Sequence, residues 1–159
     1  MADLIYMKLT GTKQGLISAS CGSIASIGTK YQVKHPDEIL VYSVQHLLTR
    51  KQNINHHAVS ITKPIDKSSP LLAKAIDSDE ELSCEISFYR TSTSGGVEKY
   101  YSIVLEKAKL DSLHCDYPHS VDNNQSQPQE IIDISYGNII WRHLIGATET
   151  YSLWIDRVY

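Results

Sequence analysis

Apolar and polar residues alternate along much of the chain. Between residues 82 and 89 the alternation leaves one apolar face, formed by Leu82, Cys84, Ile86 and Phe88. Residues 97–106 alternate in the same way, and the polar segment 91–96 between them ends in Gly95-Gly96. Strict alternation is typical of a half-buried strand, and a glycine pair allows a tight turn. The pattern therefore predicts a β-hairpin over residues 82–106.

Further segments have the composition and alternation of strands, namely residues 4–10, 14–18, 39–46, 59–63, 112–117, 131–141 and 150–154. Within the long segment 131–141, Gly137 interrupts the alternation set by Ile134 and Tyr136, which predicts a bulge or bend at this glycine. Residues 19–38 and 118–129 are predicted to be loops because they are rich in glycine, proline or polar residues.

One segment has the pattern of a helix. Ser69 is placed to act as N-cap and Pro70 as the first helical residue, where its missing N–H costs nothing. An apolar face follows, made of Leu71, Leu72, Ala75 and Ile76, with Lys74 and Asp77 opposite. The helix is expected to end near Asp79. One short α-helix among about nine strands predicts a mainly β fold, either a β-barrel or a sandwich with the helix packed on it.

Length and composition are those of an ordinary globular protein. At 159 residues the chain is predicted to form a single domain over residues 1–159 with its own core. A net charge of −3 argues against nucleic acid as the main partner. Ten tyrosines against one phenylalanine favour surfaces that are half buried and half wet, such as contacts between subunits.

The sequence also gives expectations for location and redox state. The N-terminus lacks a basic leader followed by an apolar run, and no stretch has the roughly 18 apolar residues that a membrane span needs. We therefore expect folding in the cytoplasm, no membrane insertion, and export only by a route that reads no N-terminal signal. The three cysteines, Cys21, Cys84 and Cys115, lack CxxC spacing and are expected to stay reduced, with Cys84 the most protected.

No pattern of catalytic residues is present. The nearest approach to a metal site is His114-Cys115-Asp116 with His119, but neighbouring residues of a strand point to opposite faces and cannot share a metal. The pair His56-His57 is interpreted as loop histidines, and Glu80-Glu81 as a solvated acidic pair. Hydrolase and phosphate-loop motifs are absent. The chain is therefore predicted not to be an enzyme and to need no cofactor or metal.

The segment 61–72 reads Ile-Thr-Lys-Pro-Ile-Asp-Lys-Ser-Ser-Pro-Leu-Leu. Other distinctive segments are residues 4–6, 13–18, 49–50, 52–53, 55–56, 88–91, 98–101, 117–119 and 151–154. Together they cover nearly the whole chain and resemble the enterobacterial branch of the haemolysin-coregulated protein (Hcp) family of type VI secretion. Residues 49–58 depart from the family pattern, because many members carry a longer glycine-containing insertion before the segment that begins at Ile61.

The resemblance implies a β-barrel of two packed sheets with one short helix, similar to phage tail-tube proteins. It further implies hexameric rings that stack into a tube, which a contractile sheath propels. As partners it implies other copies of the chain together with the sheath, spike and effector proteins of the type VI apparatus, and secretion of the ring itself. Two alternatives remain open at this point: a barrel that binds a small molecule, and a toxin with enzymatic activity.

The segment 33–55 is the candidate for contacts between rings, since the family uses an extended loop here. It runs from a polar turn through an apolar strand to a second polar stretch, and the alternative is a core hairpin with a solvated tip. The candidate assembly residues are Lys34, Asp37, Glu38, Thr49, Arg50, Lys51, Gln52, Asn53 and Asn55.

Overall fold

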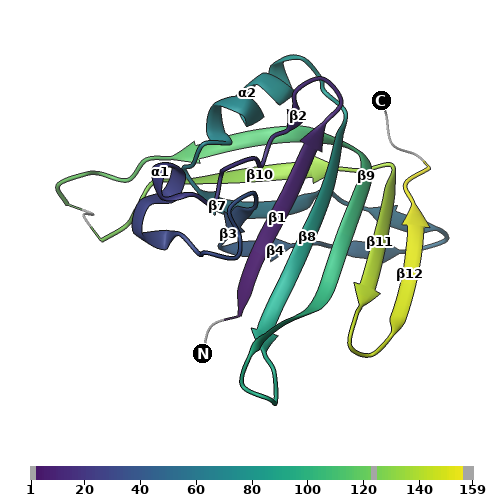
Figure 1. The fold of residues 1–159 in the computed structure, drawn as a ribbon. Helices are drawn as coiled ribbons and strands as arrows, with labels where there is room; N and C mark the ends of the chain where they lie inside the picture. Colours follow the sequence, from purple (N-terminus) through teal and green to yellow (C-terminus); the bar gives the residue numbers. More distant parts are fainter. Residues whose placement is uncertain (1–2, 123–124, 156–159) are drawn as a thin grey trace.

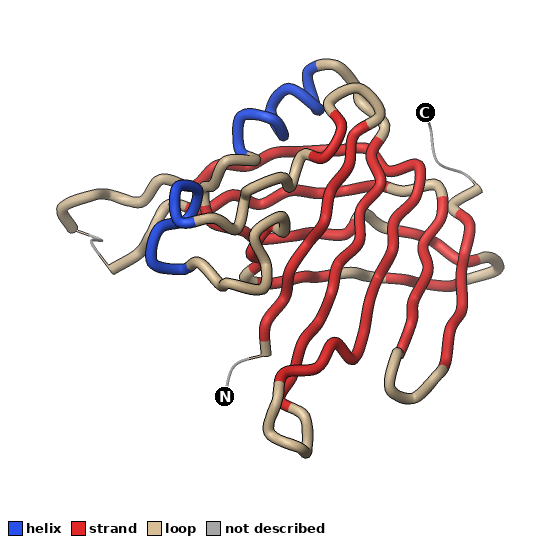
Figure 2. Tube along the Cα trace, in the orientation of Figure 1, coloured by secondary structure: helices blue, strands red, loops and turns tan. Residues whose placement is uncertain are grey.

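The computed structural model describes residues 3–122 and 125–155. The helices and strands in chain order are β1 (Leu4–Gly11), β2 (Gly15–Leu16), α1 (Ile24–Ile27), the 3-10 helix η1 (Gly28–Lys30), β3 (Ile39–Val41), β4 (Ser43–Gln45), β5 (Leu48–Arg50), β6 (Ile54–His56), β7 (Val59–Pro64), α2 (Ser69–Asp77), β8 (Leu82–Thr91), β9 (Val97–Asp116), β10 (Gln129–Ser135), β11 (Asn138–His143) and β12 (Thr148–Leu153). Strands make up most of the trace (Figure 2).

Two sheets pack against each other. The antiparallel ladders run in the order β2-β1-β8-β9-β10-β7-β4, with β11 beside β9, β12 beside β11 and β3 beside β1. In Figure 1 the strands β1, β8, β9, β11 and β12 form the front layer, while β4, β7 and β10 cross behind it. The predicted mainly β fold of two packed sheets is confirmed, and the predicted hairpin is β8 and β9.

β9 belongs to both sheets. Its residues 101–106 pair with β11, and residues 109–116 pair with β10. Between them Lys107 has a φ of 50°, a left-handed conformation that bends the strand without ending it. The prediction of two separate strands at 97–106 and 112–117 was therefore wrong, because the intervening residues continue the ladder.

Two segments predicted as single strands are divided, and each division moves the chain from one sheet to the other. Segment 39–46 breaks at Tyr42, so that β3 pairs with β1 while β4 pairs with β7. The Tyr42 N–H stays bonded, donating to the Thr62 carbonyl at 2.8 Å. Segment 131–141 breaks at Gly137, where a bend was predicted, and its N–H donates to the Glu106 carbonyl at 3.0 Å. The ladders thus follow one another around the core, with Tyr42 as the corner between β4 and β3. Of segment 14–18, only β2 is a strand.

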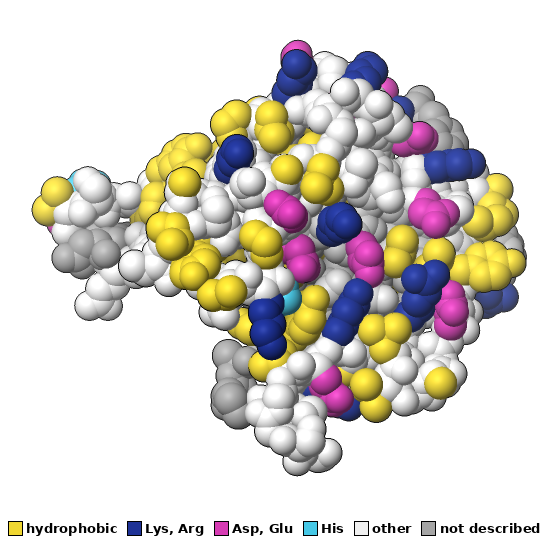
Figure 3. Space-filling model, viewed as in Figure 1, with side chains coloured by type: hydrophobic (Ala, Val, Ile, Leu, Met, Phe, Trp, Pro, Cys, Tyr) yellow, Lys and Arg dark blue, Asp and Glu magenta, His cyan; other side chains and the backbone are white. Residues whose placement is uncertain are grey.

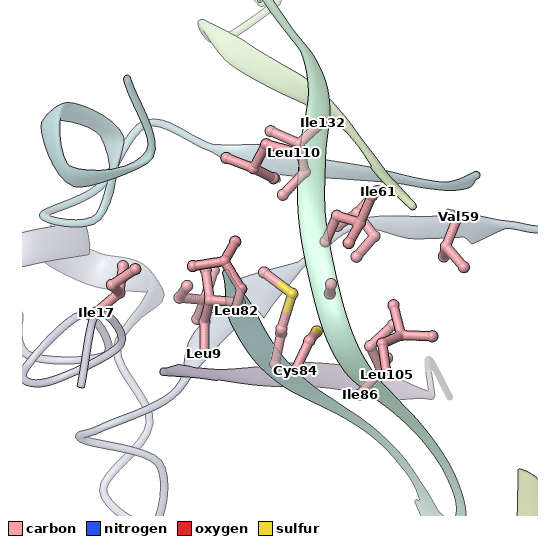
Figure 4. Packing of buried hydrophobic residues seen from close by; sticks show 14 of the residues in the cluster. Leu9, Ile17, Val59, Ile61, Leu82, Cys84, Ile86, Leu105, Leu110 and Ile132 are labelled. Atoms are coloured by element: carbon pink, nitrogen blue, oxygen red, sulfur yellow. The ribbon is translucent and has the colours of Figure 1, made fainter. Parts of the chain in front are cut away.

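The core fills the space between the sheets (Figure 4). Residues from the first sheet meet residues from the second in one contiguous cluster, whose labelled members include Leu9, Cys84, Ile86, Leu105, Ile61 and Ile132. The predicted apolar face of β8 is confirmed: Leu82, Cys84 and Ile86 are buried, and Phe88 packs against the same cluster.

Helix α2 lies across one end of the sheets, as Figure 1 shows. It begins one residue earlier than predicted, with Ser68 and not Ser69 as N-cap. Leu72 and Ala75 are buried, as predicted, whereas Ile76 is exposed. The prediction of a single helix was wrong, because α1 and η1 lie within segment 19–38, which was predicted to be a loop.

A buried ionic network links β7, α2 and β10, and it explains the distinctive segment 61–72. The Lys63 ammonium is fully buried and lies 3.1 Å from Asp66 Oδ1 and 3.2 Å from Glu130 Oε2. It also donates to the Pro64 carbonyl at 2.9 Å. The other bonds of Asp66 Oδ1 come from the backbone N–H and hydroxyl of Ser68. A buried charge must be paired and hydrogen-bonded, which fixes the residue types at these positions.

Glu80 is buried, so the interpretation of Glu80-Glu81 as a solvated pair was wrong for this residue; Glu81 is exposed. The Glu80 carboxylate lies against Gly11, where a Cβ would come within 1.7 Å of Oε2. The Gln14 backbone N–H donates to the same oxygen at 3.4 Å. Glu80 thus ties the β1–β2 turn to the end of α2.

Candidate assembly surface

The candidate assembly residues fall into two groups on different sides of the molecule. Lys34, Asp37 and Glu38 lie in the loop before β3, near α1, whereas the others lie in the β5–β6 hairpin behind β12 (Figure 1). Asp37 Oδ1 accepts the Ser20 N–H at 2.9 Å, and Glu38 Oε1 lies 3.1 Å from His35 Nδ1. These two carboxylates hold the loop together, and Lys34 is exposed.

The second group forms one small hairpin. Thr49 and Arg50 lie in β5, Asn55 lies in β6, and the turn residues include Lys51 and Asn53. Gln52 completes the turn, and all six side chains of the group are exposed. β5 and β6 pair with each other, and among the described residues no ladder joins them to either sheet. The hairpin therefore projects from the barrel.

Exposed apolar side chains and a cavity lie where the hairpin meets β12. We call this region the hairpin–β12 surface; its exposed apolar residues are Ile54, Leu153 and Ile155, which all line the same cavity. A cavity of about 450 Å³ opens here between the hairpin residues Arg50 and Asn53 and the chain from Leu153 to Ile155. β12 pairs only with β11, so its outer edge is unpaired among the described strands. Contiguous apolar exposure and open strand edges are features of contact surfaces.

Beneath this surface two histidines share one tyrosine hydroxyl. The Tyr136 hydroxyl lies 2.9 Å from His46 Nε2 and 2.8 Å from His56 Nδ1. The other ring nitrogen of His56 lies 3.0 Å from Ser152 Oγ in β12. Burial lowers the pKa of both histidines and raises that of Tyr136. The interpretation of His56-His57 as loop histidines was wrong for His56, which is buried at the end of β6; His57 is exposed.

The front face of the molecule has a mixed charge. Figure 3 shows basic and acidic side chains interspersed over the front sheet. Several form cross-strand ion pairs, including Lys99 Nζ with Glu85 Oε1 at 2.7 Å and Arg142 Nε with Glu149 Oε1 at 2.9 Å. Opposite charges across neighbouring strands each contribute little, but they leave no large field of one sign on this face.

The residues considered for a metal site are spread over the end of β9 and the following loop. His114, Cys115 and Asp116 are exposed, and His119 Nδ1 accepts the Asp122 N–H at 3.1 Å. Within residues 3–122 and 125–155, no group of three or more His, Cys, Asp or Glu side chains has the arrangement of a metal site. In the same described part of the chain, no helix is long and apolar enough to cross a membrane.

Comparison with solved structures finds close similarity over nearly the whole chain. A crystal structure of an Hcp protein matches with a TM-score of 0.91 and 30% identity, covering 98% of this chain and 100% of that one. The secreted protein Hcp3 from Pseudomonas aeruginosa matches with a TM-score of 0.88 and 37% identity, again covering 98% and 100%.

Comparison of sequences gives the same result. The major exported protein of Pseudomonas aeruginosa PAO1 is 37% identical over 167 residues, which cover 97% of this chain and 96% of that protein. The uncharacterized protein YhhZ of Escherichia coli K12 is 38% identical over 156 residues, or 94% of this chain, but the chain spans only 37% of its length. The family described as "Type VI secretion system effector, Hcp" matches residues 6–143. The chain therefore belongs to the Hcp family of type VI secretion, a family of structural tube proteins and not of enzymes.

Proposed function

We propose that the chain forms hexameric rings that stack into the inner tube of a type VI secretion machine. The contractile sheath propels this tube together with the spike, the lumen holds effector proteins, and the rings are themselves secreted without an N-terminal signal. Family membership and the similarity to a secreted Hcp protein support this function. Residues 1–159 act in it as one domain.

The hairpin–β12 surface is the observation that carries the proposal. It combines a projecting hairpin, an unpaired strand edge and exposed apolar side chains beside a cavity. A surface that receives a different surface of an identical copy generates a closed ring when the rotation between copies returns to its start. Contacts of this kind cover strand edges that would otherwise pair without control.

The apolar residues of this surface and the edge of β12 are assigned to contacts within a ring, whereas Arg50 and Lys51 at the tip of the hairpin are assigned to contacts between stacked rings. Both are exposed at the tip of the hairpin, where they reach beyond the barrel without contributing to its core. Asp37 and Glu38 contribute less, because each is already bonded within its own loop.

Light scattering at micromolar concentration and neutral pH tests the ring: the expected mass is that of six chains, and a monomer or dimer contradicts the proposal.

Arg50→Glu combined with Lys51→Glu is expected to keep the hexamer but to reduce tube formation and export. Lys13→Glu combined with Lys67→Glu is the matched control, since it changes the net charge equally at exposed positions outside the hairpin. If the hairpin variant stacks and is exported like the control, the stacking contact lies elsewhere.

A further inference from the structure

The β5–β6 hairpin is attached to the barrel mainly through side chains. Among the strands that the structure describes, its backbone ladder joins β5 to β6 and to no other strand. The chain immediately before it carries His46 and its second strand ends at His56, and both rings contact the Tyr136 hydroxyl in the link from β10 to β11. His56 also contacts Ser152, so the same cluster reaches β12. The hairpin, the link from β10 to β11 and β12 thus meet in one hydrogen-bonded cluster.

The hydrogen bonds of this cluster are complementary when both imidazoles are neutral. A hydroxyl group donates one hydrogen bond and accepts up to two, and a neutral imidazole has one donor and one acceptor. Tyr136 can therefore donate to His46 Nε2 and accept from His56 Nδ1, while Ser152 donates to His56 Nε2. If both rings are protonated, every ring nitrogen becomes a donor and the Tyr136 hydrogen has no acceptor within the cluster.

The surroundings of the rings also disfavour positive charge. Burial is the largest cause of the lowered pKa of both histidines, and the carbonyls of His57 and Leu153 oppose it only in part. The other titratable or charged groups facing the rings are His57, which repels a proton on either ring, and Arg50, which lines the same cavity as His56. Tyr136 remains neutral because burial raises its pKa. Among the described residues, no carboxylate forms an ion pair with His46 or His56.

Aromatic packing completes the cluster. The Trp154 ring stacks on His56 with the ring centroids 5.8 Å apart, and it meets Tyr136 edge-on at 5.0 Å. The backbone N–H of Trp154 donates to the Gly137 carbonyl at 2.9 Å, which fixes the end of β12 beside the cluster. Movement of His56 would therefore loosen the hairpin and β12 together.

We propose that His46, Tyr136 and His56 form a pH-sensitive clasp, which holds the β5–β6 hairpin and β12 against the barrel at neutral pH and releases them on acidification. The clasp itself does not depend on the proposed function. Its link to assembly rests on that function, because the released segments are the ones assigned to contacts between copies. The direction follows from linkage: a histidine whose pKa is lower in the folded state contributes stability that is present above its ordinary value of 6.5 and is lost as the pH falls below it.

Hydrogen exchange of backbone amides in the wild-type protein tests the clasp, with protection factors measured at pH 7.5 and pH 5.5. Amides of β5, β6 and β12 are expected to lose protection at the lower pH, because protonation of both rings leaves the Tyr136 hydroxyl hydrogen without an acceptor in the cluster. Amides of β8 in the core are expected to keep theirs. Unchanged protection of the hairpin, or an equal loss in β8, would overturn the proposal.

A variant pair that cannot be protonated supplies the decisive comparison. His46→Gln places an amide near the position of Nε2, and His56→Asn places one near the position of Nδ1, so both keep a polar contact with Tyr136. The double variant is expected to show the same hairpin protection at both pH values. His114→Gln, an exposed histidine on β9, is the matched control and is expected to respond like the wild type. A double variant that loses protection as the wild type does would overturn the proposal.

Proton NMR of the histidine rings in the wild-type protein gives an independent test that requires no variant. The C2 protons of His46 and His56 are expected to titrate with midpoints below 6.5, and midpoints at or above this value would overturn the proposal. Hydrogen exchange and NMR measure amide protection and histidine titration within the chain, whereas the charge reversal at Arg50 and Lys51 tests tube formation and export. Failure of the clasp and failure of the proposed function are therefore distinguishable.

Discussion

A buried lysine is the most unusual single residue of the fold. Lys63 is fully enclosed, and its two carboxylate partners, Asp66 and Glu130, are nearly as inaccessible. Such a network adds little stability compared with an apolar core, but breaking it leaves uncompensated charge in a medium of low dielectric constant. The network therefore makes its own residues hard to replace one at a time.

Lys63→Met is expected to lower the free energy of unfolding by about 3–5 kcal/mol, because it leaves both carboxylates buried without their cation. Urea denaturation at a fixed protein concentration measures the loss. Lys67→Met, four positions along the chain and exposed, serves as control and should change stability by less than about 0.5 kcal/mol. Equal stability of the two variants would mean that the Lys63 network is not intact in solution.

The three cysteines are free and differ sharply in accessibility. Cys21 is as fully buried as Cys84, so Cys84 is not the single most protected thiol that its strand position predicted. Burial raises the pKa of Cys21 to about 12 and also raises that of Cys84. Cys115 is exposed.

Because the thiolate is the reactive species, a thiol reagent at pH 8 is expected to modify Cys115 quickly and the other two slowly. Titration with an aromatic disulfide should count one reactive thiol per native chain and three in urea. In Cys115→Ala the fast reaction should disappear. Rapid labelling of Cys84 would show that the alternation of β8 is out of phase with the core.

At the residue scale, sequence reasoning succeeded where alternation decides burial and failed where partners come from distant segments. The apolar face of β8 follows from alternation alone. The burial of Glu80 and His56 could not be predicted in this way, because it depends on distant partners. Gln14 lies 66 residues from Glu80, and Tyr136 and Ser152 lie 80 and 96 residues from His56. A polar residue carries no local mark of the hydrogen bonds that will enclose it.

At the scale of elements, the effect of a substitution in helix α2 on folding depends on whether it lies on the buried or the exposed face. Leu72→Asp is expected to abolish soluble protein, because an unpaired charge on the buried face costs several kcal/mol out of a typical stability of about 5–15 kcal/mol. Lys74→Asp changes a side chain on the exposed face and should leave folding intact. Yields of soluble protein and circular dichroism compare the two, and similar behaviour would contradict the orientation of the helix.

The local sequence pattern predicted one of the strand breaks, at Gly137, but not the break at Tyr42. Gly137 marked its bend in advance, since glycine relaxes the limits on backbone conformation. Tyr42 gave no such signal: a tyrosine is a good strand residue, and the chain turns there because β1 and β7 offer separate ladders on either side. The continuation of β9 through Lys107 was equally hidden, since its pairing depends on β10 and β11.

At the scale of the whole molecule, β9 prevents the two sheets from unfolding independently. Its first part supplies the ladder for β8 and β11, and its second part supplies the ladder for β10. If either sheet unfolded, half of β9 would lose its pairing partners, and its backbone N–H and C=O groups would be left without hydrogen bonds.

We therefore expect a single cooperative unfolding transition in urea at fixed concentration. Tryptophan fluorescence, which reports on Trp141 in the front sheet and on Trp154 beyond β12, should follow the same curve as far-ultraviolet circular dichroism, which reports on all strands. Amides in β8 and in β10 should share the highest protection against hydrogen exchange. Two separate transitions would indicate that the bend at Lys107 divides the molecule into units of different stability.

The continuity of β9 also determines how the molecule responds to mechanical force. In an antiparallel pair the hydrogen bonds lie perpendicular to the strands, so tension along β9 loads the bonds to β8, β10 and β11 in shear and simultaneously. Peeling at a strand end would break such bonds one at a time and at lower force. A push or pull on one sheet thus reaches the other along a covalent backbone, and each sheet should be stiffest along the direction of its own part of β9.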